Sequence, residues 1–440
     1  MKWPFLFLSI FMTLPVVGET LTMSTMDAMQ LAGNLVERGD LSHAEQILNN
    51  MPPMADIALE TERSFLRGQI AMARGDYDMA AKIYRDLLDM YPDLARVRYE
   101  LARVYMYQKK WHRADYHLRL AMAGRELPND VKNTMSYMRY LVRQNKNWNT
   151  WFNIGAAPDN NINNATGGTE CVDTMFGPMC RELADPESAV GINVALGGDY
   201  EFKIDKNWRW KNSGTLYLNK YNLREYDDLY IGASTGPRYV YEHGSVWLSG
   251  VFARRYYGWD PYMYKYGVRI DTDYDFTRRL SLNASIEYAK NKYDQYSSVM
   301  NSDGYYGNLA LIYSIDASKY IVMRGGVSRE IAHADAYSLW RPGFGIGFGA
   351  ELPYGFSFYA EPYFYWTAYD AARWVVYDGR FSKITEHDFT HRYSVRISNN
   401  KLDIWGFVPT ITYSYTQRDS NVWQREFKKH SIEFTMMQRF

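Results

Sequence analysis

The chain ends in Ser431-Ile432-Glu433-Phe434-Thr435-Met436-Met437-Gln438-Arg439-Phe440, a stretch that alternates between apolar and polar side chains. Successive side chains of a strand point to opposite faces. One face would carry Ile432, Phe434, Met436 and Phe440, and the other Ser431, Glu433, Thr435 and Arg439. Only Gln438 interrupts the apolar face. This split is typical of a strand with lipid on one side and water on the other, so it predicts a strand of a membrane barrel.

The same alternation recurs from Trp148 onward and is clearest in residues 190–203, 279–288 and 389–398. A soluble β-sandwich would need only short strands, whereas these segments are long and numerous. We therefore predict a fourteen-stranded antiparallel transmembrane β-barrel. Its strands are expected to begin near residues 148, 188, 207, 226, 244, 261, 279, 303, 318, 338, 353, 386, 402 and 426.

The first eighteen residues have the layout of a secretory signal peptide, with Lys2 before an apolar run and Gly18 at the cleavage site. No later window is apolar enough for a membrane-spanning helix. A terminal phenylalanine that closes an amphipathic strand resembles the signal that bacterial outer-membrane proteins present to their insertion machinery. The predicted location is therefore the outer membrane of a Gram-negative bacterium.

A shift in composition divides the mature chain. Only nine of the 39 tyrosines lie before residue 147, and tyrosine and tryptophan are the residues that girdle membrane barrels. We predict a signal peptide over residues 1–18, a periplasmic helical domain over 19–146 and an outer-membrane barrel over 147–440. Basic and acidic residues are equal in number, at 50 each, which gives no reason to expect nucleic-acid binding.

The predicted connections between strands alternate in length. Short turns at residues 205–207, 242–244, 316–318, 352–355 and 399–401 are expected in the periplasm, by the usual rule for barrels. Longer connections, expected outside the cell, are residues 158–187, 292–303, 331–337, 368–386 and 418–425.

Between residues 23 and 144 the hydrophobic pattern has a helical period and repeats. Ala44, Ala80 and Ala114 occupy equivalent positions, 36 and 34 residues apart, as expected of tetratricopeptide repeats. A small residue is needed there because the two helices of each unit cross closely. A last helix, from about Asn129 to Arg143, would cap the array.

Short helical repeats of this kind bind a segment of another protein in a concave groove. The positions expected to line it, and so to bind a client protein, are Glu62, Phe65, Gln69, Met72, Arg96, Tyr99, Arg103 and Met106. The tripeptide Arg38-Gly39-Asp40 looks like an adhesion motif. It recurs as Arg74-Gly75-Asp76 at the same repeat position, which predicts a turn between helices instead.

Cys171 and Cys180 lie in a polar segment of a chain predicted to be exported, which favours a disulfide over a metal site. No catalytic residues or cofactor are predicted. His387 and His391 would lie on one face of a strand. At the usual rise per residue they would be about 14 Å apart, too far to share a metal ion. The glycines at 343, 345, 347 and 349 alternate with apolar residues inside a strand, which suggests curvature or room in the lumen rather than a phosphate loop.

Charged residues of both signs are predicted to face the lumen, which argues against a dedicated anion or cation pore. They are Asp199, Glu201, Arg279, Glu287, Arg392, Arg396, Glu433 and Arg439. Paired structural charges are the simpler interpretation.

The stretch Trp151-Phe152-Asn153-Ile154-Gly155, followed by Asp159-Asn160-Asn161-Ile162-Asn163, resembles the surface lipoprotein assembly modifier (Slam) family. In that family a strand followed by an Asp-x-Asn-Ile/Val-Asn signature opens the barrel domain. The signature falls on Asp159, Asn161, Ile162 and Asn163. The sequence departs from it in Pro158 and in the cysteine-containing insertion that follows.

The resemblance implies an outer-membrane translocator that delivers surface lipoproteins or haemophore-like proteins from the periplasm to the cell surface. Expected partners are the client, periplasmic chaperones, the outer-membrane insertion machinery and outer-membrane lipids. The chain is expected to act as a monomer and not as an enzyme. A client would leave through the lumen or through the seam between the first and last strands, to which Trp151, Ile154, Phe434 and Phe440 are assigned.

Two other functions remain open. A polysaccharide-export barrel also joins helical repeats to a barrel, but usually with many more repeats and a strongly charged lumen. A diffusion porin with accessory repeats would leave the helical domain unexplained.

Overall fold

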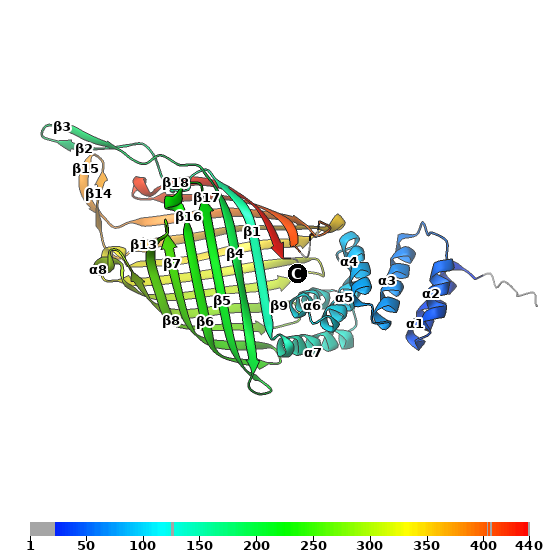
Figure 1. The fold of residues 1–440 in the computed structure, drawn as a ribbon. Helices are drawn as coiled ribbons and strands as arrows, with labels where there is room; N and C mark the ends of the chain where they lie inside the picture. Colours follow the sequence, from blue (N-terminus) through cyan, green and yellow to red (C-terminus); the bar gives the residue numbers. More distant parts are fainter. Residues whose placement is uncertain (1–22, 125–126, 403, 405–406, 439–440) are drawn as a thin grey trace, which may run out of the picture.

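The computed structural model describes residues 23–124, 127–402, 404 and 407–438, and within these ranges helices stack against one end of a closed barrel (Figure 1). The predicted signal peptide, together with Arg439 and Phe440, lies outside them. No helix in the described ranges has the length and apolar character needed to cross a bilayer.

Within residues 23–124 and 127–147, seven helices precede the barrel: α1 (Thr25–Arg38), α2 (Leu41–Asn50), α3 (Ile57–Ala73), α4 (Tyr77–Met90), α5 (Ala95–Tyr107), α6 (Trp111–Ala123) and α7 (Asn129–Asn145). Both Arg-Gly-Asp tripeptides are turns between helices, as predicted. Gly39 and Gly75 have φ of +80° and +79°, a conformation that glycine adopts without strain. Asp40 and Asp76 then cap α2 and α4 by accepting a hydrogen bond from a backbone N–H of the first turn.

The alanines of the repeat pattern, Ala44, Ala80 and Ala114, are fully buried between helices. Gly68 shows how close this packing is, because a Cβ atom there would overlap the ring of Tyr84. The predicted helical domain is confirmed. Its assignment as a tetratricopeptide repeat stays a prediction.

The barrel is closed by fourteen antiparallel strands, as predicted. They are β1 (Trp148–Asp159), β4 (Ala189–Lys203), β5 (Trp208–Tyr221), β6 (Asp228–Tyr241), β7 (Gly244–Tyr257), β8 (Asp260–Asp275), β9 (Leu280–Tyr293), β10 (Ser302–Ser314), β11 (Lys319–Ala332), β12 (Leu339–Glu351), β13 (Phe356–Tyr369), β16 (His387–Asn399), β17 (Phe407–Ser420) and β18 (Phe427–Gln438).

Two strands begin later than expected. The strand predicted near residue 353 starts at Phe356, because Tyr354 and Gly355 form a turn with φ of +65° and +78°. The strand predicted near residue 402 starts at Phe407. The short turns also include residues 276–279, between β8 and β9, which the sequence pattern did not single out.

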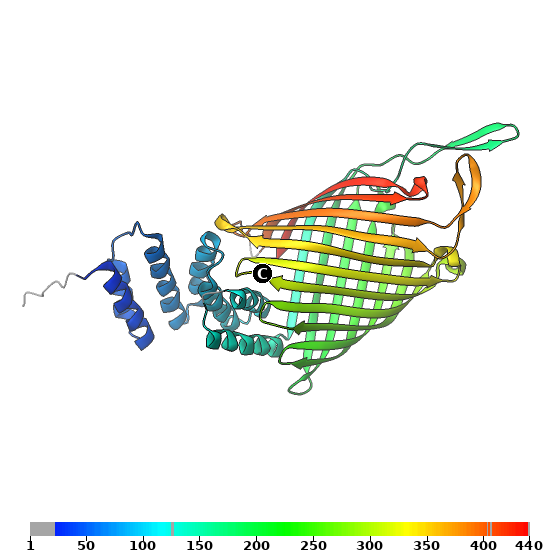
Figure 2. The same ribbon diagram turned by 180° about the vertical axis from the view of Figure 1, so that it is seen from behind.

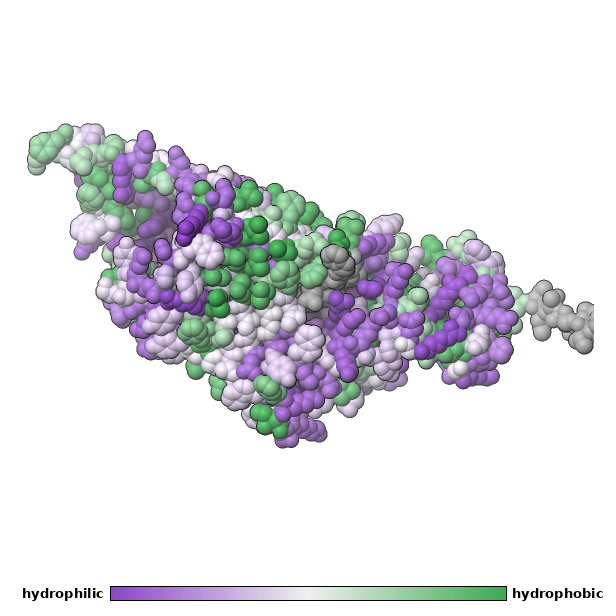
Figure 3. Space-filling model, in the orientation of Figure 1, coloured by the Kyte–Doolittle hydropathy of each residue, from purple (hydrophilic) through white to green (hydrophobic). Residues whose placement is uncertain are grey.

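The barrel wall has the predicted two faces. Ile286 is 72% exposed on the outer face, whereas its neighbour Glu287 is buried on the inner face. Hydrophobic side chains gather on the barrel wall, and hydrophilic ones cover much of the helical domain (Figure 3). Together with the closed topology, this surface is that of a barrel in the outer membrane of a Gram-negative bacterium.

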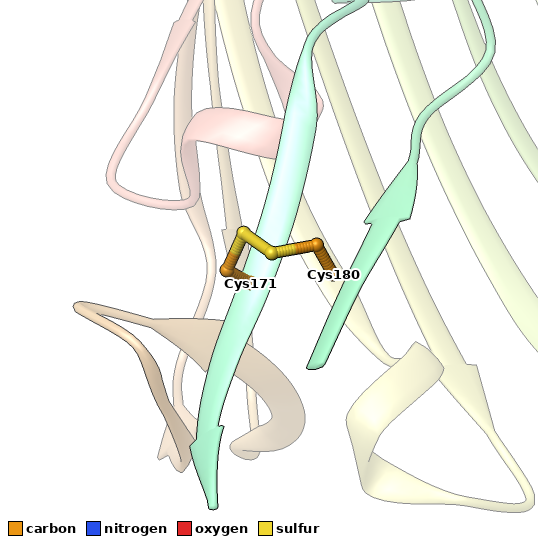
Figure 4. Close-up of a disulfide and its surroundings, with 2 residues drawn as sticks. All are labelled: Cys171 and Cys180. Carbon is orange, nitrogen blue, oxygen red and sulfur yellow. A yellow bond between two sulfur atoms is a disulfide. The ribbon is translucent and has the colours of Figure 1, made fainter. Parts of the chain in front are cut away.

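The longer connections lie at the end of the barrel opposite the helices (Figure 2). They carry two hairpins, β2 (Thr169–Thr174) with β3 (Gly177–Glu182), and β14 (Arg373–Tyr377) with β15 (Arg380–Ile384), and a short helix, α8 (Ser297–Met300). The predicted disulfide is confirmed. Cys171 and Cys180 are partners across the β2–β3 hairpin and are joined by an S–S bond (Figure 4).

Candidate functional site at the mouth, lumen and seam of the barrel

Helix α7 is held against the periplasmic end of β8 by ion pairs. Arg139 lies 2.9 Å from a carboxylate oxygen of Asp275, and Arg143 pairs with both Asp275 and Asp273. Arg143 also donates a hydrogen bond to the carbonyl of Glu242 in the β6–β7 turn. These arginine side chains are at least nine-tenths buried, so they attach the helix firmly to the rim.

A second attachment joins α5 and α6 to the end of β12. The guanidinium of Arg98 is fully buried and lies 2.5 Å from Glu351. The hydroxyl of Tyr116 donates a hydrogen bond to the other carboxylate oxygen of Glu351. One carboxylate at the barrel rim thus binds two helices.

The periplasmic turns add further contacts. Arg278 donates to the side chains of Asn129 and Asn133 on α7, at 2.8 and 2.7 Å. Arg279 donates to the carbonyl of Ala123 at the end of α6, so it lies in the turn and contacts the helices instead of facing the lumen as predicted. Arg209 donates to the carbonyl of Gln144. Helices α5 to α7 are therefore docked on the periplasmic mouth.

Helix α6 forms part of the wall of a lumen cavity of about 700 Å³, to which it contributes Tyr116 and Arg119. The cavity is otherwise lined by inward-facing residues of the strands, including Arg392 and Arg396. In the described part of the chain, the side chains of these two arginines have no hydrogen-bond or ion-pair partner. The docked helix thus narrows the route from the periplasm into the lumen.

His112 of α6 is enclosed at this junction. Burial, and to a smaller extent the nearby Lys146, lower its pKa to about 4, although Asp115 and Asp199 partly oppose the shift. Burial likewise lowers the pKa of Lys146 to about 8. Within the described residues the Nε2 atom of His112 has no hydrogen-bond partner. The imidazole is therefore neutral at pH 7.

Most other lumen charges are paired. Glu201 binds Arg238 at 2.5 Å, and Glu287 binds Lys265 at 2.7 Å. The signs are mixed, as predicted. The first pair bridges β4 and β6 across β5, and the second joins the neighbouring strands β9 and β8. Arg439, another predicted lumen residue, is outside the described ranges.

The glycine row of β12 faces the lumen and makes room for tyrosines. A Cβ atom on Gly347 would overlap Tyr359, and one on Gly349 would overlap Tyr320. These two rings stack on each other and line the same cavity. The row provides space for side chains, one of the two roles expected from its sequence.

Within the described residues, the seam between β1 and β18 is paired over a shorter stretch than the other side of β1. Strand β1 pairs with β4 from Trp148 to Asp159, but its described partners on β18 span Ser431 to Met437. Ile154 is opposite Met436, and Ala156 is opposite Phe434. Trp151 instead packs over Gly197 of β4, and Phe440 lies outside the described residues.

Where the strand pairing of β1 with β18 ends, residues 159–163, here called the clasp, add contacts that hold β1 to β18. Asp159 binds Lys429 at 2.7 Å. Asn161 is 2% exposed, and its amide donates to the carbonyls of Lys428 and Ala165. The backbone N–H of His430 donates to the side chain of Asn160 at 2.7 Å. The clasp continues the attachment to β18 after regular pairing ends.

The rest of the clasp fixes the segment that leads into β4. The N–H of Ile162 donates to the carbonyl of Glu187, and the Asn163 amide donates to the carbonyl of Asp185. Of the four signature residues, Asp159 and Asn161 therefore bind β18 across the seam, whereas Ile162 and Asn163 bind the connection into β4.

The two extracellular hairpins contact each other. The N–H of Asp173 donates to the carbonyl of Gly379 at 2.8 Å, and the Gln424 amide, from the β17–β18 connection, donates to Glu170. At the tip of the β2–β3 hairpin, Phe176 is 94% exposed.

The residues expected to line the repeat groove lie on α3 and α5 and are engaged with one another. Phe65 is buried, with the Arg96 guanidinium 4.0 Å from its ring centroid, and Arg96 also pairs with Glu62 at 3.4 Å. Arg103 pairs with Glu100. The other predicted groove residues, Gln69, Met72, Tyr99 and Met106, are half-buried. Their role in client binding stays a proposal.

The docking residues were not found from the sequence. Arg98, Arg139 and Arg143 are arginines at buried positions of amphipathic helices, which is unusual unless the charge is paired. That was the one available signal, and it does not identify the partners, which lie on distant strands.

Comparison with known proteins finds a matching protein family for the barrel. A family model described as "Surface lipoprotein assembly modifier" matches residues 148–440. A curated relative with that description from Pasteurella multocida (strain Pm70) is 23% identical over 326 residues, covering 68% of this chain and 61% of the relative. Another from Moraxella catarrhalis is 23% identical over 316 residues, covering 70% and 60%. The chain thus spans about three-fifths of the length of these relatives.

Among solved structures, the chain is similar to the crystal structure of the outer membrane channel DcaP of Acinetobacter baumannii. The match covers 67% of this chain and 97% of the DcaP chain, with 8% sequence identity and a TM-score of 0.38.

Proposed function

This chain belongs to the surface lipoprotein assembly modifier family, and on that premise we propose that it carries lipoprotein clients from the periplasm to the cell surface. The observation that carries the proposal is the docking of α5 to α7 on the periplasmic mouth of the barrel. A protein-binding helical array placed at the entrance of a lumen is suited to admit one kind of cargo and to exclude small solutes.

In the proposed cycle, the client binds the repeat groove and shifts the helices away from the rim. The ion pairs of Arg139 and Arg143 with Asp275 are exchanged for contacts with the client or with water. The client then enters the lumen, or passes along the seam when the clasp releases β18. Folding of the client outside the cell would drive the step, without nucleotide or catalysis.

Periplasmic chaperones and the outer-membrane insertion machinery are proposed as further partners, and a monomer is the proposed working unit. A diffusion porin is disfavoured by the helices across its mouth. The mixed, mostly paired lumen charges favour a polysaccharide exporter less than a protein carrier.

The test is to lock the helices in place. Cysteines that replace Asn133 and Arg278, which are in contact, can be joined by a bismaleimide in living cells. Epitope-tagged lipoproteins of the same genome are then scored for surface exposure with antibody. Display that depends on this protein should be lost on cross-linking and kept in the untreated double variant. Undiminished display in fully cross-linked cells would refute passage gated by the helices.

A further inference from the structure

A groove of about 710 Å³ lies on the outer wall of the barrel, across strands β5 to β9. It exists because Gly250 leaves the wall without a side chain, between Phe252 on its own strand and Val268 on β8. Phe252 and Val268 are 54% and 53% exposed on the outer face. The volume is within the ~300–1,000 Å³ typical of ligand sites.

The end of the groove nearer the periplasm is polar. Asn212, close to the start of β5, and Thr235 on β6 are paired across the strands and face the bilayer. The hydroxyl of Thr235 donates to the amide oxygen of Asn212 at 2.8 Å and accepts from the indole N–H of Trp210 at 2.9 Å. Among the described residues, the amide nitrogen of Asn212 has no hydrogen-bond partner. It therefore offers two free N–H donors to the membrane.

The groove rises across the wall as it crosses the strands. Successive cross-strand partners lead from Asn212 to Thr235, Gly250, Val268 and Tyr288. Asn212 is near the periplasmic start of β5, whereas Tyr288 is in the extracellular half of β9. At this upper end Lys290 is paired with Asp303 at 3.1 Å. The groove thus extends from the periplasmic half of the wall into its extracellular half.

An unpaired amide donor facing a bilayer is costly, unless a lipid or a membrane-bound ligand supplies an acceptor. Ester and amide carbonyls next to acyl chains are such acceptors. A phosphate would require a cation, but the polar lining at the lower end, Asn212, Ser213 and Thr235, is neutral. Among the described residues that line the groove, the one cation, Lys290, lies at the other end and is already paired.

We propose that this groove binds the acyl chains of a client's lipidated N-terminus while the client crosses from the periplasmic to the outer leaflet. The Asn212 amide donates to an ester or amide carbonyl of the lipid, and the space above Gly250 holds an acyl chain. The proposal rests on the proposed function, since it concerns a lipidated client. It places the lipid outside the barrel, separate from the path of the protein part.

Native mass spectrometry of the full-length protein in detergent can test this, with a synthetic diacylglyceryl-cysteine peptide as the probe. Gly250→Phe fills the groove and should weaken binding about tenfold or more, the effect of losing roughly 1.4 kcal/mol. Asn212→Leu removes the donor and should weaken it about threefold to tenfold. The matched control is Leu248→Phe, on the same face of β7 but outside the groove, which should bind like the parent protein.

Two results would overturn the proposal: unchanged binding by Gly250→Phe, or displacement of the peptide by an equal concentration of phosphatidylethanolamine, which would make the groove a general lipid site. Each variant is first shown to form the heat-modifiable barrel on gels. Surface display in the helix-locking experiment is scored separately. A failure of transport is therefore distinguishable from a failure of lipid binding.

Discussion

Arg143, near the end of α7, is ion-paired with Asp275, the last residue of β8, although 132 positions separate them in the sequence. The pair is almost buried, and it joins the domain predicted to bind a client to the barrel that would carry it. Removing one partner of a buried pair typically costs about 3–5 kcal/mol, because the other charge is left without compensation.

Arg143→Ala should therefore loosen the docked helices. We expect channel openings in planar bilayers to become at least roughly a hundredfold more frequent than in the parent protein, since ~1.4 kcal/mol corresponds to a factor of ten. The control is Arg74→Ala, which breaks the exposed pair with Glu45 far from the barrel and should leave conductance unchanged. Equal opening frequencies in both variants would show that the ion pair does not hold the mouth closed.

The clasp gives a second prediction. Asn161→Ala removes the hydrogen bond from a buried position just after β1 to the Lys428 carbonyl of β18, so the seam should open more easily at its extracellular end. The expected loss is about 1–3 kcal/mol, from the groups left unsatisfied. It should appear as a lower temperature for the loss of heat-modifiable migration. Ser188→Ala, which removes one long 3.4 Å hydrogen bond to the same segment, is the control and should change little.

If the clasp also controls client release, Asn161→Ala should change surface display without reducing the amount of assembled barrel. A variant that only lowers barrel yield would support a structural role and contradict a role in release.

The barrel could be predicted because lipid and water impose opposite chemistry on alternate residues. Leu282 and Ser281 can be assigned to their faces without knowing any neighbour. The docking of the helices on the barrel could not be predicted, because a lone Arg143 in a helical pattern does not reveal that Asp275 is its partner. Likewise, Asn161 was recognised by its motif, but its bond to the carbonyl of Lys428 exists only after the barrel closes.

The repeat groove illustrates a different limit. Repeat positions identify which residues share a helix face, but not whether a neighbouring repeat covers that face. Phe65 was expected to be available to a client. It is 2% exposed because it packs in the core of the helical domain against Tyr84, and Arg96 of α5 also lies over its ring.

The disulfide gives a third prediction. Cys171 and Cys180 close a short loop, and such a bond is worth roughly 2–3 kcal/mol to the structure that it closes. Replacing both with serine should make the β2–β3 hairpin sensitive to protease added to intact cells, with cleavage near its exposed tip at Phe176. The barrel should keep its melting temperature, because the hairpin is a separate two-stranded sheet. A large fall in barrel stability would contradict this local role.

His112 predicts a dependence on pH. Its pKa is about 4 in the folded protein and about 6.5 when exposed, so the unfolded or undocked state binds more protons between these values. Stability from burying the neutral imidazole is fully present above pH 6.5 and is lost as the pH falls toward 4. The total change is on the order of 3 kcal/mol. Helix unfolding, followed by circular dichroism, should therefore occur at lower temperature at pH 5 than at pH 7.

The slope of stability against pH tests whether His112 causes this acid sensitivity. His112→Gln keeps a neutral polar side chain and should remove most of the loss between pH 6.5 and 4, whatever its stability at pH 7. His43→Gln alters an exposed histidine on α2, far from the barrel, and should retain the parent slope. Burial raises the pKa of Asp115, but Arg139, Arg143 and Arg119 together lower it well below its usual value. Asp115 would therefore act only below this range, so it does not obscure the comparison. If His112→Gln and the parent lose stability in parallel, the acid sensitivity comes from another group.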